Sequence, residues 1–178
     1  ITTNGGLWRY KIGDTVMFTS REPYRICITG RTQQYINAFG EELMVDNADK
    51  AIEITAKAQH AEIRDYTAAP IHMTYSGKGG HHWLIEFEKA PTSLDAFAEQ
   101  LDAELKKLNS DYEAKRFQSM ALERLKITSL PQGTFNRWLE KKGKAGSQAK
   151  IPRLCNDRKY LDDILAMISH HIRENEPI

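Results

Sequence analysis

The feature that most constrains the fold of this chain is a helical repeat of apolar residues between positions 91 and 108. Leucine or phenylalanine recurs there every three or four residues, with acids and lysines between, at Leu94, Phe97, Leu101, Leu105 and Leu108. Because an α-helix completes a turn in about 3.6 residues, these side chains line one face, which other parts of the chain must cover. We therefore expect an amphipathic helix that contributes to a protein core and not to a lipid-binding surface.

Strand-like runs come before this helix. Residues 66–76 and 82–88 are rich in aromatic and aliphatic side chains, and a glycine-rich segment separates them. This arrangement predicts an antiparallel strand pair. The loop contains Lys78 but lacks the spacing of a P-loop, so we favour a hairpin connection over a phosphate site. His81 and His82 are neighbours on a strand and point to opposite faces, so we do not expect them to share a metal ion.

The rest of the chain also alternates between strand and helix patterns. We expect short strands at 15–19, 25–29 and 123–130, with a turn at Glu22-Pro23 between the first two. We expect helices at 46–58, from residue 110, from residue 134 to Gly143, and at 156–174. Asp46, Ser110 and Thr134 have side chains that suit the N-terminal caps of the first three. The pattern predicts an α+β fold in which a small, mostly antiparallel sheet is flanked by helices.

Composition excludes several classes of function. The chain has 178 residues and a net charge of +1, which gives no general attraction to nucleic acid or to anionic lipid. No apolar run approaches the length of a membrane span. Two cysteines make no disulfide framework, so we expect a reducing cytoplasm. The chain begins at Ile1 without methionine and runs directly into a motif, so we interpret it as the C-terminal part of a longer protein.

Two motifs near the start resemble the hinge region of the acyl-adenylate-forming superfamily. The first is Tyr10-Lys11-Ile12-Gly13-Asp14, and the second runs from Gly30-Arg31 to Gly40. In that superfamily a Y-R-x-G-D segment ends the large domain, and a G-R-x-D-D-x-I-K-x-x-G segment opens the small C-terminal domain. The spacing from Gly30 to Gly40 is the same here. The resemblance therefore implies that residues 1–29 end a large N-terminal domain and that residues 30–178 form the mobile C-terminal domain.

Motifs further along narrow the resemblance. The chain carries Asn109-Ser110-Asp111-Tyr112, Arg116, Gly133-Thr134-Phe135 and Gln148-Ala149-Lys150-Ile151-Pro152-Arg153. Together they are similar to the acyl-acid amido synthetases of the auxin-responsive Gretchen Hagen three family, with the runs INAFGEEL and WLIEFEK closest to its bacterial branch. Tyr112 and Arg116 lie four residues apart on one helical face, and we interpret this pair as packing residues.

The resemblance implies a ligase that uses ATP and Mg²⁺. It would join a carboxylic acid to an amino acid through an acyl-adenylate, releasing pyrophosphate and AMP. Asp14 would accept hydrogen bonds from the ribose hydroxyls of ATP, Arg31 would contact nucleotide oxygens, and Gln33 would mark the hinge. Lys150 would be the catalytic lysine of the adenylation step. Without the large domain, the chain alone is expected to be inactive.

Each of these assignments has a structural alternative. Asp14 also suits a turn after glycine, and Arg31 also suits the exposed end of a strand. Lys150 lies in a basic stretch that is typical of a solvated loop, and Lys144 and Arg153 compete with it for the catalytic role. Two alternative functions remain open, namely an adenylate-forming ligase with coenzyme A as acceptor and a non-catalytic interaction domain. Asn37, which stands where many acyl-CoA ligases have lysine, weighs against the first.

Overall fold

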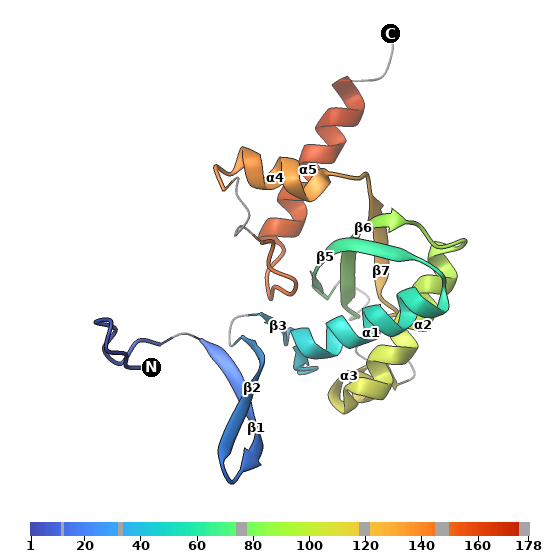
Figure 1. Cartoon of the computed structure of the whole chain (residues 1–178). Helices are drawn as coiled ribbons and strands as arrows, with labels where there is room; N and C mark the ends of the chain where they lie inside the picture. Colours follow the sequence, from blue (N-terminus) through green and yellow to red (C-terminus); the bar gives the residue numbers. More distant parts are fainter. Residues whose placement is uncertain (12, 32–33, 74–77, 118–121, 145–149, 175–178) are drawn as a thin grey trace.

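The computed structural model describes residues 1–11, 13–31, 34–73, 78–117, 122–144 and 150–174 (Figure 1). The first half of the chain contains β1 (Asp14–Arg21), β2 (Tyr24–Arg31), β3 (Tyr35–Ile36), β4 (Leu43–Met44), α1 (Val45–Ala58) and β5 (Glu62–Ile71). The second half contains β6 (Gly80–Lys89), α2 (Leu94–Leu108), α3 (Ser110–Arg116), β7 (Lys126–Leu130), α4 (Thr134–Lys141) and α5 (Lys159–Glu174). The predicted α+β class is confirmed.

A three-stranded sheet with the order β5-β6-β7 forms the centre of the molecule. β5 and β6 pair antiparallel, as predicted, with Ala68 opposite Trp83. β7 instead runs parallel to β6, because the chain crosses back over the sheet through α2 and α3 before it enters β7. The other two sheets are two-stranded and antiparallel.

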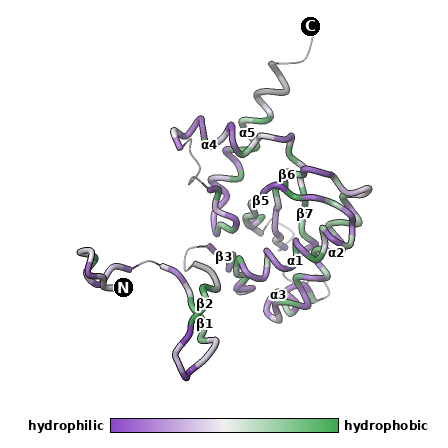
Figure 2. The backbone as a smooth tube through the Cα atoms, in the orientation of Figure 1, coloured by the Kyte–Doolittle hydropathy of each residue, from purple (hydrophilic) through white to green (hydrophobic). Residues whose placement is uncertain are grey.

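Helices cover both faces of the central sheet (Figures 1 and 2). Trp83 and Ile85 of β6 belong to the hydrophobic cluster that also contains buried residues of α1 and α2. Leu84, between them, belongs to the second cluster, which is completed by residues of α4 and α5. Successive side chains of a strand point to opposite faces, so β6 is buried on both sides. This double burial explains the consecutive apolar residues Trp83, Leu84 and Ile85 in β6.

The helix N-termini differ from the predicted caps at three places. α1 begins one residue earlier than expected, and the backbone N–H of Met44 donates to the side chain of Asn47 at 3.2 Å, so Asp46 is not the cap. Asn109, one residue before Ser110, accepts the Tyr112 N–H at 2.7 Å and caps α3. At α3 the neighbouring residues Asn109 and Ser110 both suit the cap, whereas at α1 the cap position is held by Met44 and Asn47 in the first turn accepts its N–H.

The start of α4 uses an acceptor from another element. Gly133 precedes the helix with φ of 78°, and the hydroxyl of Thr134 donates to the Pro131 carbonyl at 2.6 Å instead of capping. The buried carboxylate of Glu86 on β6 takes the cap position, because it accepts the N–H groups of Gly133 and Phe135 at 2.6 and 3.1 Å. The cap on Thr134 predicted from the sequence is therefore wrong.

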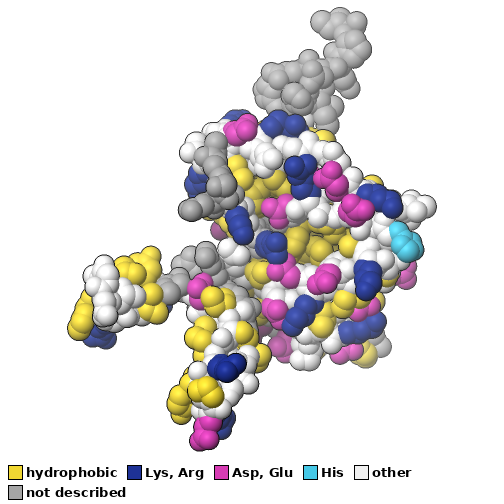
Figure 3. Space-filling view, viewed as in Figure 1, with side chains coloured by type: hydrophobic (Ala, Val, Ile, Leu, Met, Phe, Trp, Pro, Cys, Tyr) yellow, Lys and Arg dark blue, Asp and Glu magenta, His cyan; other side chains and the backbone are white. Residues whose placement is uncertain are grey.

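The β1–β2 hairpin projects away from the body that the central sheet and the helices form (Figures 1 and 3). Its apolar side chains are largely exposed, with Val16, Phe18, Ile26 and Ile28 between 50 and 69% accessible. Among the described residues, no helix has both the length and the apolar character that crossing a membrane requires.

Candidate functional site

The open end of the β1–β2 hairpin brings two predicted nucleotide-binding residues together. Asp14 is the first residue of β1 and Arg31 the last of β2, and the two are direct partners in the strand register. Asp14 is half-buried and follows Gly13, whose φ is 82°. The side chain of Arg31 and the whole of Gln33 lie outside the described residues. The backbone therefore places Asp14 and Arg31 opposite each other on paired strands, which the spacing of the motifs alone did not predict.

Lys150 lies on the surface, just before a segment that is fixed to the central sheet. Its side chain is exposed, and the next residue, Ile151, is buried in the cluster beneath α4 and α5. The Ala68 N–H of β5 donates to the Arg153 carbonyl at 2.8 Å, and the Cys155 N–H donates to the Ala68 carbonyl at 3.0 Å. These bonds form a parallel bridge along the edge of β5. Lys150 is thus an exposed ammonium immediately before residues 151–155, which are bonded to the β5 edge and which we call the anchor segment.

Arg153, one rival for the catalytic role, has its guanidinium engaged elsewhere. It forms an ion pair with Asp49 of α1 and lies over the ring of Tyr66, 5.3 Å from its centroid. The Tyr66 hydroxyl also donates to Asp49, at 2.6 Å. Burial, reinforced by this hydrogen bond to a carboxylate, raises the pKa of Tyr66 far above its usual value. Arg153 therefore joins α1, β5 and the anchor segment.

Lys144, the other rival, lines a cavity between the end of α4 and the start of α5. The cavity has a volume of about 350 Å³ and is lined by Trp138, Lys142, Lys144, Lys159, Tyr160 and Asp163. Asp163 accepts from the Trp138 indole at 2.7 Å and pairs with Lys142 at 2.8 Å. The hydrogen bond from Lys142, followed by that from Trp138, lowers the pKa of Asp163. Lys150 is not among the residues that line this cavity.

The predicted packing pair Tyr112 and Arg116 is buried around Asp102 of α2. The Asp102 carboxylate accepts from the Tyr112 hydroxyl at 2.7 Å and from the Arg116 guanidinium at 2.6 and 2.9 Å. Burial alone would raise the pKa of Asp102, but the bonds from Arg116, Lys106 and Tyr112 outweigh it and lower the pKa. The cluster holds α3 against α2, which fits the packing role expected for both residues.

A buried pair that the sequence patterns did not indicate joins the β3–β4 connection to β6. His81 Nε2 lies 2.8 Å from Glu41 Oε1, and both side chains are fully buried. The other oxygen of Glu41 accepts the Phe39 N–H at 2.7 Å. Burial acts to raise the pKa of Glu41, but the hydrogen bond from His81 and the backbone donors lower it overall. The pair thus joins residues that lie 40 positions apart in the sequence.

His82 faces the other side of the sheet, as the strand pattern predicted. Its Nε2 lies 2.9 Å from the Thr128 hydroxyl of β7. Burial, together with the nearby charges of Arg158 and Lys126, lowers the pKa of His82 to about 4. In the parts of the chain that the structure describes, no three histidine, cysteine or acidic residues are grouped to hold a metal ion.

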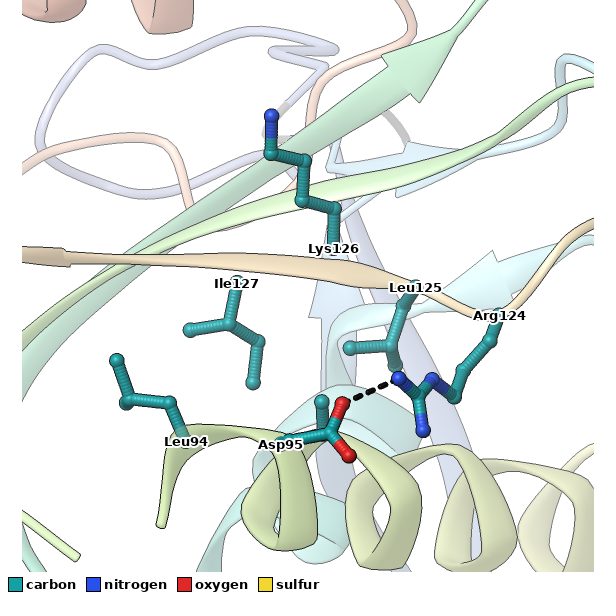
Figure 4. Close-up of a pocket in the computed structure, with 7 residues that line it drawn as sticks. Leu94, Asp95, Arg124, Leu125, Lys126 and Ile127 are labelled. Atoms are coloured by element: carbon teal, nitrogen blue, oxygen red, sulfur yellow. Dashed lines mark hydrogen bonds and ion pairs between the residues drawn. The ribbon is translucent and has the colours of Figure 1, made fainter.

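A second cavity, of about 410 Å³, lies between the start of α2 and the strand β7 (Figure 4). Leu94, Ala98 and Ile127 are among its apolar lining, and an ion pair between Asp95 and Arg124 crosses it. None of the predicted site residues lines it. The groups around it form no arrangement of acid, base and nucleophile, so it is not our candidate site.

The fold and the site together define a small α+β domain that has an exposed lysine next to the anchor segment and a projecting hairpin with exposed apolar side chains. The family model described as "GH3 family C-terminal domain" matches residues 46–159, well over half of the chain. The chain belongs to this family.

Relatives of known function are plant acyl acid amido synthetases. Indole-3-acetic acid-amido synthetase GH3.10 of Arabidopsis thaliana is 27% identical over 177 residues, covering 93% of this chain and 29% of the relative. The solved structure of GH3.15 acyl acid amido synthetase superposes with a TM-score of 0.72 at 20% identity, over 93% of this chain and 31% of that chain. A second structure, AtGH3.15 in complex with 2,4-DB, gives 0.71 at 19% identity. The chain thus spans less than a third of the length of these relatives.

Proposed function

We propose that this chain is the C-terminal part of an ATP-dependent acyl acid amido synthetase, with the bacterial branch of the family as the expected source. The observation that carries the proposal is the placement of Lys150, exposed beside a segment fixed to the β5 edge, in a domain of the GH3 family. The engagement of Arg153 by Asp49 supports Lys150 as the catalytic member of the basic stretch.

The proposed reaction has two steps. In the first, a carboxylate oxygen of the acid attacks the α-phosphorus of ATP, the bond to the β-phosphate breaks, and pyrophosphate leaves. In the second, the amine of an amino acid attacks the acyl carbonyl, AMP leaves, and the amine loses a proton. The ammonium of Lys150 would stabilise the negative charge that develops in the first step. A fixed charge does this best because the protein need not reorganise during the reaction.

The nucleotide would lie near the open end of the β1–β2 hairpin. The carboxylate of Asp14 has two acceptor oxygens and can hold the vicinal hydroxyls of a ribose, while Arg31 would donate to nucleotide oxygens. Mg²⁺ would accompany the triphosphate. The described residues hold no acidic cluster of their own for the ion.

We further propose that residues 1–29 belong with a large N-terminal domain and that Gln33 lies at the pivot between the domains. Two features support this division. The hairpin exposes apolar side chains that a neighbouring domain would cover. From Asn37 onward the chain is tied to the core, because the Asn37 N–H donates to the Asn156 side chain at 2.7 Å and Glu41 is buried against His81. Closure of the domains would exclude water from the acyl-adenylate. We expect the protein to work in the cytoplasm.

Acid-dependent release of pyrophosphate by the full-length protein tests this function. The assay supplies ATP, Mg²⁺ and a panel of carboxylic acids, and then offers amino acids or coenzyme A as acceptors. We expect amide products with amino acids. Thioester products would transfer the assignment to a coenzyme A ligase, and a full-length protein that releases no pyrophosphate with any acid would favour a non-catalytic interaction domain. The 178-residue chain alone should show no turnover.

A further inference from the structure

The segment that follows Lys150 is fixed by side chains as well as by the backbone bridge to β5. The Thr67 hydroxyl donates to the Pro152 carbonyl at 2.7 Å, and Arg153 pairs with Asp49 of α1. We propose that Asp49 is a positioning residue that sets the place of Lys150 by holding Arg153. This inference rests on the proposed function, in which Lys150 is the catalytic group.

Asp49 is itself held by the core of the domain. Its Oδ1 accepts the hydroxyl of Tyr66 at 2.6 Å, and the Tyr66 ring stacks on Trp83 at 5.4 Å between centroids. Tyr66 is 3% exposed and Trp83 is fully buried. The same Oδ1 meets the Arg153 guanidinium. The buried aromatic residues therefore fix the orientation of the Asp49 carboxylate independently of its contact with Arg153.

These contacts tie the anchor segment to the central sheet and to α1. Arg153 is held at its carbonyl by Ala68 and at its guanidinium by Asp49, so both its backbone and its side chain are constrained. Lys150 lies only three residues upstream, with the buried Ile151 between them. Displacing a catalytic group by about 1 Å can cost roughly 100-fold in rate. A loosened Arg153 would therefore reduce the rate even though it does not touch the substrates.

A positioning role for Asp49 can be distinguished from a role in folding stability. The ion pair between Asp49 and Arg153 is partly exposed, with side-chain accessibilities of 38 and 44%. Ion pairs of this kind contribute little to folding stability. Its removal should therefore leave the melting temperature nearly unchanged, so a fall in rate could not be explained by unfolding.

The test uses Asp49→Asn in the full-length protein, because asparagine keeps the size and can still accept from Tyr66 but loses the charge that holds Arg153. We expect kcat for acid-dependent pyrophosphate release to fall roughly 10- to 100-fold, with KM for ATP little changed. The matched control is Asp95→Asn, which removes another surface ion pair, between α2 and Arg124 just before β7 (Figure 4). The control should keep the wild-type kcat.

A double variant separates this proposal from the proposed role of Lys150. If Asp49 acts through Lys150, then Asp49→Asn should add no further loss in a Lys150→Ala background. A full additional loss there, or an unchanged kcat in the single Asp49→Asn variant, would overturn the positioning role while leaving Lys150 catalytic. An unchanged rate in Lys150→Ala alone would overturn the catalytic role of Lys150 and the positioning role with it.

Discussion

Replacing Asp102 by alanine should destabilise the domain more than any single change on its surface. Asp102 and Arg116 are buried, with side-chain accessibilities of 5 and 7%, and the carboxylate accepts two bonds from the guanidinium and one from the Tyr112 hydroxyl. Asp102→Ala would leave the positive charge of Arg116 buried without its carboxylate partner. Breaking a buried pair by removing one partner costs about 3–5 kcal/mol.

Urea unfolding of the 178-residue chain, followed by circular dichroism, measures this cost. A loss of that size corresponds to a fall in Tm of roughly 10 °C for a protein of this length. Lys106→Ala is the matched control, because Lys106 also contacts Asp102, at 2.5 Å, but its side chain is 34% exposed. The control should cost at most about 1 kcal/mol.

The double variant Asp102→Leu with Arg116→Met tests the reason for the loss. Replacing both members of a buried ion pair by apolar residues is often far less costly than removing one. We expect the double variant to recover much of the stability lost in Asp102→Ala. An unfolding free energy for Asp102→Ala within about 1 kcal/mol of wild type would refute the reasoning, since it would mean that the buried charge finds other compensation.

Two further predictions concern β6 and its surroundings. The pKa of His82 is lowered to about 4, so the folded state resists protonation while the unfolded state binds a proton near pH 6.5, and stability should fall by about 2 kcal/mol from pH 8 to pH 5. His82→Asn should remove that part of the pH dependence in urea titrations, and an unchanged slope would contradict it. Gly79→Ala should destabilise by roughly 1–3 kcal/mol, because its Cβ would meet the Phe39 ring at 2.2 Å and the Ile71 carbonyl at 2.8 Å. Thermal unfolding measures this, and a neutral result would show that the β3–β4 connection moves freely.

The regular elements of the central domain follow largely from the sequence. The apolar stripe from Leu94 to Leu108 forms α2, because a helical period holds over many residues. The strand expected at 82–88 lies within β6, but the strand expected at 66–76 starts and ends too late, since β5 begins at Glu62 and ends at Ile71. The direction of β7 does not follow in this way. The sequence pattern of a strand is the same whether the strand pairs parallel or antiparallel. The direction of β7 relative to β6 is set by the crossover through α2 and α3.

The candidate site could be predicted in part. Motif resemblance proposes Asp14, Arg31 and Lys150 as site residues, which stay predictions, and the structure adds that Asp14 and Arg31 are direct partners on paired strands. The separation of Lys150 from Arg153 needed the structure, because two basic residues three apart look alike in a sequence and differ only in their partners. The buried pair of Glu41 and His81 joins residues 40 positions apart, and no helical or strand period in the sequence indicates such a contact.

The most direct test of the central claim is the formation of amide product by the full-length protein and by its Lys150→Ala variant, measured by mass spectrometry with ATP, Mg²⁺, an accepted acid and an amino acid. We predict amide from the wild-type protein and a rate lower by about 100-fold or more in the variant. Equal rates of amide formation in the two proteins would contradict the assignment of Lys150, and a wild-type protein that releases pyrophosphate without forming amide would contradict the assignment as an amido synthetase.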